Sequence, residues 1–422
     1  MTERLLQFIW QFQYFNRTEL AAINGDEIQI IAPGFFNRDQ GPDFSNAKIK
    51  IGNTTWAGTV ELHVNTSDWN KHFHGHDRNY TNVILHVVWK HDDSPNTIPV
   101  LELQPLVSNH LLDKYEVLMQ SQGFIACEKM TGNVKAITWQ SWKERLVAER
   151  LLRKSAIAKE LLSENNHHWE ESFWWLLARN FGMKVNAAAF EEIARSVPVT
   201  ILAKHKQQIH QIEALLFGQA GLLNTDFEEE YPKLLQREYR FLASKYKLTP
   251  IHQPVHFLRM RPGNFPTVRL AQLAMLVKQS AHLFSKIKET EDLKTMKMCF
   301  AATANDYWHY HYRFDEPGSY KEKTIGAATV ENILINTVIP VLFAYGSFYN
   351  EQTYKDKALQ WLEELKAEAN SITNGFAGLG IENKNAFDSQ ALIELKNEYC
   401  TKKRCLECSI GNALLKQLQE PK

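Results

Sequence analysis

A chain of 422 residues with 44% hydrophobic and 23% charged residues has the composition of a globular protein, which excludes a disordered chain. Its 48 Lys+Arg balance its 48 Asp+Glu, so no net field draws it toward nucleic acid or an anionic membrane. The length exceeds that of a single hydrophobic core and predicts two or three domains.

The first part of the chain combines one helix with several strands. Residues 5–15 carry apolar side chains at helical spacing and predict an amphipathic helix. Ser67 is a candidate N-cap for a short helix between the third and fourth predicted strands. The predicted strands cover residues 27–31, 48–51, 56–64, 83–89 and 100–103.

From about residue 108 the apolar spacing becomes that of long helices. The main helical segments are residues 142–162, 169–181, 187–196, 201–217, 231–245, 269–287, 327–345 and 353–371. No repeat of fixed period is present, so a solenoid is not predicted. We therefore expect an α+β protein in which a mixed α/β sheet domain, residues 1–125, precedes an irregular all-helical domain, residues 126–422.

Three features predict a cytoplasmic protein that does not bind a membrane. The N-terminus begins with an amphipathic segment and not with the apolar segment of a signal peptide. The most hydrophobic stretch, residues 333–345, is too short to span a bilayer, and it predicts a buried helix that Pro340 either kinks or divides. The five cysteines do not form the disulfide framework of a secreted protein.

Two carboxylates lie on neighbouring predicted strands. Asp43 is followed, after seventeen residues, by Glu61-Leu62-His63. Alternation puts Glu61 and His63 on one strand face, and a hairpin can bring Asp43 near them. Two acids in one small space repel unless a cation lies between them, and such oxygens suit Mg²⁺ or Mn²⁺, the ions of phosphodiester cleavage. The alternative is a surface hairpin with two unrelated acids.

A run of histidines follows the third predicted strand. His72, His74 and His76 occupy alternate positions and could present nitrogens to one transition metal, with Asp68 or Asp77 adding oxygen. Within a nuclease-like site, His74 is also a candidate base. The alternative is a polar loop that joins two strands.

The second cluster of candidate ligands is near the C-terminus. Cys400, Cys405 and Cys408 follow the spacing Cys-x₄-Cys-x₂-Cys, which suits Zn²⁺ or an iron–sulfur cluster, with Cys127 as the fourth ligand. A structural metal is expected and not redox catalysis, because no flavin or nicotinamide fingerprint accompanies the cysteines. The alternative is a set of reduced, partly buried thiols.

Two arginines mark an irregular connector between helical segments. Arg259 and Arg261 flank Met260, and strand-like alternation would point both guanidinium groups to one side for phosphate or carboxylate recognition. The alternative is a connector in which these arginines satisfy buried carbonyl groups.

The Pro42-Asp43 pair and the Glu61-x-His63 triplet resemble the PD-(D/E)xK nuclease superfamily, in which Lys is usual at the position of His63. The resemblance implies that Asp43 and Glu61 hold the metal and that His63 activates or orients water, since a neutral imidazole can accept a proton. It also implies hydrolysis of DNA or RNA, with the helical domain holding the nucleic acid through Arg259 and Arg261.

The neutral overall charge and the missing Lys favour a rival interpretation. In it, the α/β domain is a non-catalytic nuclease fold that serves interaction or scaffolding. A third interpretation is a metal sensor that uses the histidines or the cysteines.

A second resemblance extends over nearly the whole chain. Five segments are similar to those of an uncharacterised bacterial family of unknown function: residues 58–63, 67–69, 82–88, 257–266 and 404–408. This resemblance implies membership of that family and brings no assigned activity with it.

Overall fold

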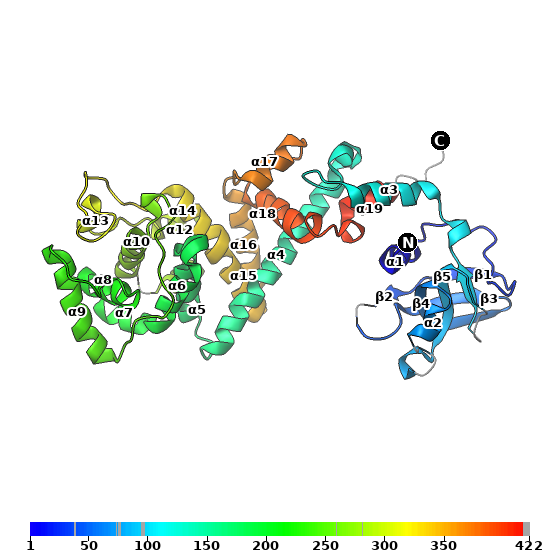
Figure 1. Ribbon diagram of the computed structural model, residues 1–422, viewed down its shortest axis with the longest axis horizontal. Coiled ribbons are helices and arrows are strands. Elements are labelled where there is room, and N and C mark those ends of the chain that lie inside the picture. The colour runs from blue at the N-terminus through cyan, green and yellow to red at the C-terminus, as the bar shows by residue number, and fades with distance from the viewer. Residues whose placement is uncertain are drawn as a thin grey trace. The chain divides into compact units, whose positions relative to one another are not determined.

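The computed structural model describes residues 1–37, 39–72, 74, 77–93, 98–258, 260–280 and 282–416. The protein is α+β, with a mixed sheet near the N-terminus followed by a mostly helical part, as predicted (Figure 1). It divides into two compact units, of which the first contains residues 1–142 and the segment from Leu395 onward, and the second contains residues 143–394. This division differs from the single boundary expected at residue 126, because the return of the C-terminal segment depends on contacts that no local pattern encodes.

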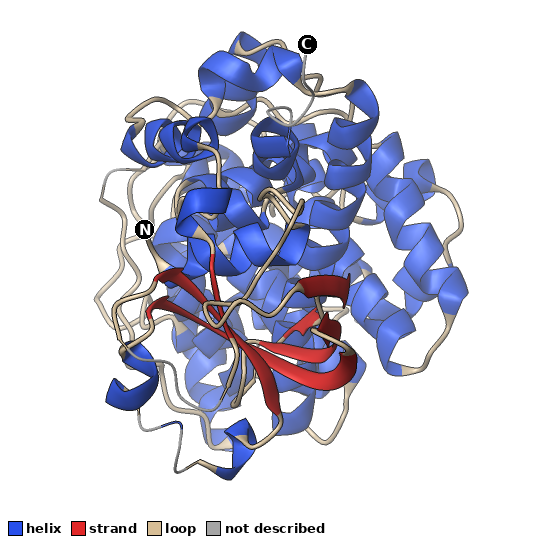
Figure 2. Ribbon diagram, turned by 90° about the vertical axis from the view of Figure 1, so that its right-hand side faces the viewer, coloured by secondary structure: helices blue, strands red, loops and turns tan. Residues whose placement is uncertain are grey.

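A six-stranded sheet forms the centre of the first unit, in the order β1-β3-β4-β5-β6 with β2 paired to β3. The strands are β1 (Ile28–Ala32), β2 (Phe35–Phe36), β3 (Phe44–Ile51), β4 (Thr54–Asn65), β5 (Val83–Lys90) and β6 (Val100–Glu102). β1, β3 and β4 are antiparallel neighbours, whereas β5 and β6 run parallel to β4. Figure 2 shows the strands in red as one twisted sheet. All five predicted strands are present, and β2 is an addition.

Helix α1 (Glu3–Phe12) opens the chain and packs against β4. Its first turn is capped by Thr2, whose hydroxyl oxygen accepts the N–H of Leu5 at 3.3 Å. Leu6, Ile9 and Trp10 on one helix face are fully buried, and each contributes roughly 1.5–3 kcal/mol by leaving water. The predicted amphipathic helix is therefore confirmed.

The middle of β4 is buried on both faces. Val60 and Leu62 point to one side and Glu61 and His63 to the other, and all four are at most 5% exposed. Because β5 runs parallel to β4, a crossover must join them. It consists of α2 (Asp68–Lys71), which packs against β4, and a 3₁₀ turn at Arg78–Tyr80.

The C-terminal segment completes the first unit. The unit's remaining elements are a 3₁₀ turn at Gln104–Leu106, α3 (Asn109–Gln120), a 3₁₀ turn at Glu128–Asn133, the start of α4 (Ala136–Glu164), a π-helical turn at Leu395–Cys400, a 3₁₀ turn at Cys405–Glu407, and α19 (Ser409–Lys416). The hydroxyl of Tyr14 donates to Oδ1 of Asn412 at 2.7 Å, and Arg4 pairs with Glu407 at 2.9 Å. These contacts join the two ends of the chain.

The second unit is helical throughout its regular elements. After α4 its helices are α5 (Trp169–Phe181), α6 (Met183–Ser196), α7 (Val199–His205), α8 (Ile209–Gln219), α9 (Glu230–Tyr246), α10 (Pro266–Gln279), α11 (Leu283–Glu289), α12 (Leu293–Cys299), α13 (Tyr307–Tyr310), α14 (Ala327–Ile333), α15 (Ile339–Phe348), α16 (Gln352–Glu364), α17 (Ser371–Gly378) and α18 (Ala386–Glu394). The single helix predicted over residues 269–287 is instead α10 and α11, because Ser280 adopts an extended conformation.

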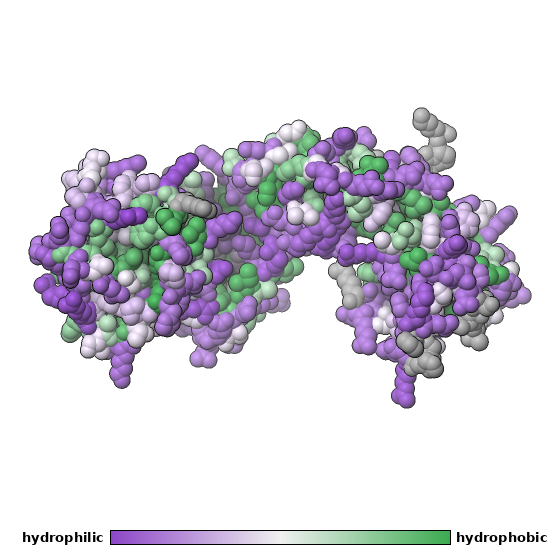
Figure 3. Space-filling view, viewed as in Figure 1, coloured by the Kyte–Doolittle hydropathy of each residue, from purple (hydrophilic) through white to green (hydrophobic). Residues whose placement is uncertain are grey.

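The most apolar helix of the second unit runs continuously from α14 to α15. A π-helical turn at Leu334–Val338 joins them immediately before Pro340, where a widened turn accommodates the missing N–H group. By length and composition the helix Ala327–Phe348 could cross a membrane, and 67% of its most apolar window is buried inside the protein. The prediction of a buried helix is confirmed, and its length was underestimated. On the face shown in Figure 3, hydrophilic residues dominate, with apolar residues between them.

Candidate metal centre

Asp43 and Glu61 are held side by side at the start of β3 and the middle of β4. The register pairs Phe44 with Val60, which brings the residues next to them together. The backbone N–H of Asp43 donates to Oε2 of Glu61 at 3.0 Å, and the backbone N–H of Leu62 donates to Oδ2 of Asp43 at 3.1 Å. From α1, the side-chain amide of Gln7 donates to Oδ1 of Asp43 at 2.7 Å. Three hydrogen bonds therefore orient the two carboxylates.

Burial and mutual repulsion make this acid pair difficult to ionise. Burial and then the charge of Asp43 raise the pKa of Glu61 to about 8. Burial also raises the pKa of Asp43 to about 6, against the hydrogen bonds from Leu62 and Gln7. Two carboxylates so placed do not both carry full charge at neutral pH unless a cation compensates them.

Four histidine rings gather beside Glu61. Nε2 of His63 and Nε2 of His74 lie 3.6 Å and 3.5 Å from the same atom, Oε1 of Glu61. His63 also contacts two further rings, with Nε2 at 3.2 Å from Nδ1 of His72 and Nδ1 at 2.9 Å from Nε2 of His86. One ligand atom from each of His63, His72 and His74 lies within 4.8 Å of the other two. This spacing suits a single metal ion.

The buried rings are neutral at pH 7. Burial, followed by the neighbouring imidazoles, lowers the pKa of His63 to about 3, and burial lowers the pKa of His86 to about 4. A neutral imidazole donates from one nitrogen and accepts at the other, so His63 is engaged at both by His72 and His86. In contrast, Nε2 of His74 is buried and has no hydrogen-bond partner among the described residues. His74 therefore has a nitrogen available for a cation or a proton.

Aromatic rings form the walls around the histidines. The ring of Tyr80 stacks on His74 with 3.8 Å between ring centroids, and Trp69 lies edge-on to His63 and His74. Trp69 is 4% exposed. These rings exclude water from one side of the cluster, which strengthens the electrostatic interactions within it.

The other predicted ligands of the histidine-rich crossover are Asp68, Asp77 and His76. Asp68 accepts the backbone N–H of Asn65 at 3.0 Å and pairs with Lys71 at 2.7 Å, and Asp77 caps the 3₁₀ turn that follows it. Both acids therefore have a local structural task and do not join the cluster. His76 lies outside the described residues.

His86 was missed by the sequence analysis, although β5 itself was predicted. The register pairs Glu61 with His86 across two parallel strands, so both side chains emerge on the same face. The signal was a single histidine in the otherwise apolar run Val83-Ile84-Leu85-His86-Val87. Its importance depends on the neighbouring strand, which the run alone does not identify.

The predicted arginine site lies in the second unit. Arg261 is exposed and precedes a 3₁₀ turn at Pro262–Asn264. Arg259 lies outside the described residues.

The four cysteines proposed as ligands all belong to the first unit. Cys127, Cys405 and Cys408 are buried, Cys400 is partly buried, and all four are free thiols. Burial and then the neighbouring thiols raise the pKa of Cys127 to about 12, and the same two causes raise the pKa of Cys400. The residues are therefore electrostatic neighbours. Within the described part of the chain, no three of their sulfur atoms all lie within 4.8 Å of one another, as the ligand atoms of the histidine group do.

Comparison with known proteins gives one match. The family model described as Protein of unknown function (DUF2851) matches residues 3–371. No curated protein and no solved structure gives a significant match.

Proposed function

The chain belongs to the family described as Protein of unknown function (DUF2851), and we propose that its first unit is a metal-dependent hydrolase that cleaves phosphodiesters of DNA or RNA. One observation carries the proposal. A buried acid pair, Asp43 and Glu61, shares its space with His63 and His74, whose Nε2 atoms both lie within 3.6 Å of one Glu61 oxygen. Such a group needs a cation to offset its charge and offers both oxygen and nitrogen ligands.

The order of elements supports a PD-(D/E)xK type of fold. Helix α1 is followed by the antiparallel strands β1, β3 and β4, then by the crossover with α2, and then by the parallel strand β5. Asp43 stands at the start of the second of these strands, and Glu61-x-His63 stands on the third. Two departures are the histidine in place of Lys and the single turn of α2, where a fuller helix is usual.

The residues around Glu61 fit a divalent metal ion. Asp43 and Glu61 supply carboxylate oxygens, and His74 supplies a buried nitrogen for which the described residues provide no hydrogen-bond partner. Of Mg²⁺ and Mn²⁺, this mixed set favours Mn²⁺, because Mg²⁺ strongly prefers oxygen ligands in regular octahedral geometry. When bound, the ion would act as a Lewis acid and would orient the attacking water and the phosphate.

The hydrogen bonds favour His74, and not His63 as the sequence predicted, as the histidine that contacts the attacking water. We assign His74 to the metal or to the attacking water, since its Nε2 atom is unused. His63 and His72, whose ligand atoms lie within 4.8 Å of one another and of that of His74, are the further nitrogen ligands open to the ion, and His86 holds His63 in place through its Nδ1 atom. Asp43 and Glu61 hold the ion, and Gln7 keeps the Asp43 carboxylate in its orientation. In the second unit, Arg259 and Arg261 remain proposed contacts for phosphate groups.

The experiment compares cleavage by the full-length wild type with cleavage by two variants. Labelled single- and double-stranded DNA and RNA are incubated with each protein in Mn²⁺, Mg²⁺ or a chelator. Glu61→Gln removes the central carboxylate, whereas Glu27→Gln makes the same chemical change at an exposed position next to β1. We expect metal-dependent cleavage by wild type and Glu27→Gln only. Silence of the folded wild type on every substrate would reject catalysis and favour the interaction or scaffold interpretation.

A further inference from the structure

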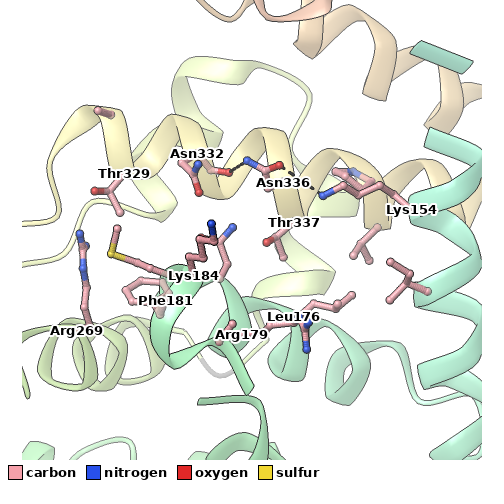
Figure 4. Close-up of a pocket in the computed structure, with 17 residues that line it drawn as sticks. Lys154, Leu176, Arg179, Phe181, Lys184, Arg269, Thr329, Asn332, Asn336 and Thr337 are labelled. Atoms are coloured by element: carbon pink, nitrogen blue, oxygen red, sulfur yellow. Dashed lines mark hydrogen bonds between the residues drawn. The ribbon is translucent and has the colours of Figure 1, made fainter. Parts of the chain in front are cut away.

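The second unit contains a cavity of about 580 Å³ that has no part in the proposed metal centre. Side chains from α4, α5, α6 and α10 line it together with side chains of the continuous helix α14–α15 (Figure 4). Its volume is within the range of sites that hold small organic molecules.

Every charged side chain in the described lining of this cavity is a cation. The four are Lys154, Arg179, Lys184 and Arg269, and no carboxylate lines the cavity beside them. Arg179 pairs with Glu191 at 2.6 Å, outside the lining. Lys184 is exposed. The two remaining cations, Arg269 and Lys154, decide what the cavity could hold.

Arg269 is a buried guanidinium without a counter-ion among the described residues. It is 7% exposed, and its hydrogen bonds go to neutral oxygens, to Gln272 at 3.2 Å and Asn264 at 2.6 Å. Its Nε atom is buried with no partner. Burial alone lowers the pKa of Arg269, with no carboxylate opposing the effect. A buried charge in this state is unfavourable unless an anion joins it.

Lys154 is the second under-compensated cation. Burial and then the positive charges of Arg150 and Arg153 lower its pKa to about 8. Glu394 accepts hydrogen bonds from both of those arginines, whereas the hydrogen bond that the described residues give Lys154 is to Oδ1 of Asn336, at 3.5 Å. Glu394 and Glu368 offset the lowering of the Lys154 pKa only in part. Figure 4 shows Lys154 and Arg269 on opposite sides of the view, with Asn336 beside Lys154.

The lining of the cavity is mainly apolar, although the neutral polar side chains of Asn332, Asn336 and Thr337 are part of it. Its apolar side chains are those of Ile157, Leu176, Phe181, Met183, Pro340 and Val341. An inorganic ion alone would leave this apolar surface uncovered, and a neutral apolar molecule would leave Arg269 without a partner. A molecule that carries both an apolar body and an anionic group satisfies both parts of the cavity.

We propose that this cavity binds a small amphipathic anion. The carboxylate or phosphate group of the ligand binds Arg269, and its apolar body lies along the side chains of α5 and α14–α15. Where the ligand has a second anionic group, Lys154 binds it. The inference is independent of the phosphodiesterase proposal, because every residue it uses belongs to the second unit.

The test measures binding of defined probes to the full-length protein by calorimetry and thermal shift. Decanoate and octyl phosphate carry an apolar chain with a carboxylate or a phosphate, and decanedioate carries a carboxylate at each end. Decanol and inorganic phosphate each lack one of the two required parts. We expect binding by at least one amphipathic anion, with decanol and inorganic phosphate at least tenfold weaker. The ratio of decanoate to octyl phosphate binding identifies the head group.

Two variants locate the binding. Arg269→Met and Lys154→Met remove one cation each and keep an apolar chain of similar length, and Arg240→Met, on the exposed face of α9, is the control. We expect Arg269→Met to weaken binding of the preferred monoanion at least tenfold, and Lys154→Met to remove any preference for decanedioate. Equal binding of decanol, absence of binding by all three amphipathic anions, or unchanged binding by a folded Arg269→Met would overturn the proposal.

Discussion

Nε2 of His74 lies 3.5 Å from Oε1 of Glu61, although His74 belongs to the crossover and Glu61 to the middle of β4. The contact brings a nitrogen with no hydrogen bond to a carboxylate whose pKa is raised by burial and by Asp43. A cation at this point would give the His74 nitrogen a partner and would compensate the negative charge of Glu61.

Mn²⁺ should stabilise the folded protein through this point. Ligand that binds only the native state raises the free energy of unfolding, by about 2.7 kcal/mol at one hundred times the Kd. We expect added Mn²⁺ to raise the Tm of wild type and of Glu27→Gln, and to have no effect on Glu61→Gln. Differential scanning fluorimetry in matched ionic strength measures this. A Tm increase of the same size in Glu61→Gln would place the ion elsewhere.

Loss of the His74 ring should impair cleavage more than it impairs folding. We expect His74→Gln to lower the rate of metal-dependent cleavage by about 10–100-fold, because a metal ligand or its support is removed. His110→Gln, at an exposed position on α3, is the matched control and should cleave as wild type does. Initial rates on the preferred substrate, with circular dichroism to check folding, provide the comparison. Wild-type rates in a folded His74→Gln would remove this residue from the site.

The cysteine cluster predicts one structural metal per chain. If Cys127, Cys400, Cys405 and Cys408 hold Zn²⁺, purified protein should contain about one zinc per chain by elemental analysis, and an iron–sulfur cluster would instead give iron and visible absorption. Cys405→Ser should lose the metal and lower the Tm. Cys299→Ser, which alters the one cysteine of the second unit, should keep both. If purified wild type contains no metal and Cys405→Ser has the same Tm as wild type, the four cysteines are structural thiols and not metal ligands.

Glu213 should make the second unit less stable as the pH rises. It is 0% exposed, accepts hydrogen bonds from Tyr231 and Trp308, and has a pKa raised by burial from 4.5 to about 7. Between these values the native state binds the proton more tightly than the unfolded state. The free energy of unfolding therefore falls as the pH rises through this window, by roughly 3 kcal/mol in total, and it stays lower above pH 7.

Glu213→Gln should remove this pH dependence, because the amide oxygen still accepts hydrogen bonds and carries no charge. Urea unfolding at pH 5 and pH 7.5 measures the difference, with the exposed Glu230→Gln as the control. If the free energy of unfolding changes with pH equally in Glu213→Gln and in wild type, another group is responsible for the pH dependence.

Local sequence patterns predicted α1 and five of the six strands of the first unit, but not β2, α3 or α19. Alternation along β4 correctly placed Glu61 and His63 on one face, and the expected hairpin joins β3 to β4 and brings Asp43 near them. These features depend on residues that are neighbours in sequence, so a single chain reveals them.

The remaining features depend on pairings between distant residues. His86 joins the candidate site only through the parallel register of β4 and β5. In the sequence, Arg269 is one residue of an ordinary apolar helix, and only the packing of the neighbouring helices places it in the lining of the cavity. The return of the segment from Leu395 to the first unit likewise leaves no local signal.

That return constrains the order of biosynthesis. The first unit receives Asn412 and the three C-terminal cysteines only after the whole second unit has emerged from the ribosome. Until then, Tyr14 on the N-terminal side lacks the Asn412 partner, and Cys127 lacks the other three thiols. The second unit has all of its own residues available earlier and can fold first as a unit. Completion of the first unit is therefore a late event, and premature termination would leave this unit without its C-terminal segment even though its sheet had been fully translated.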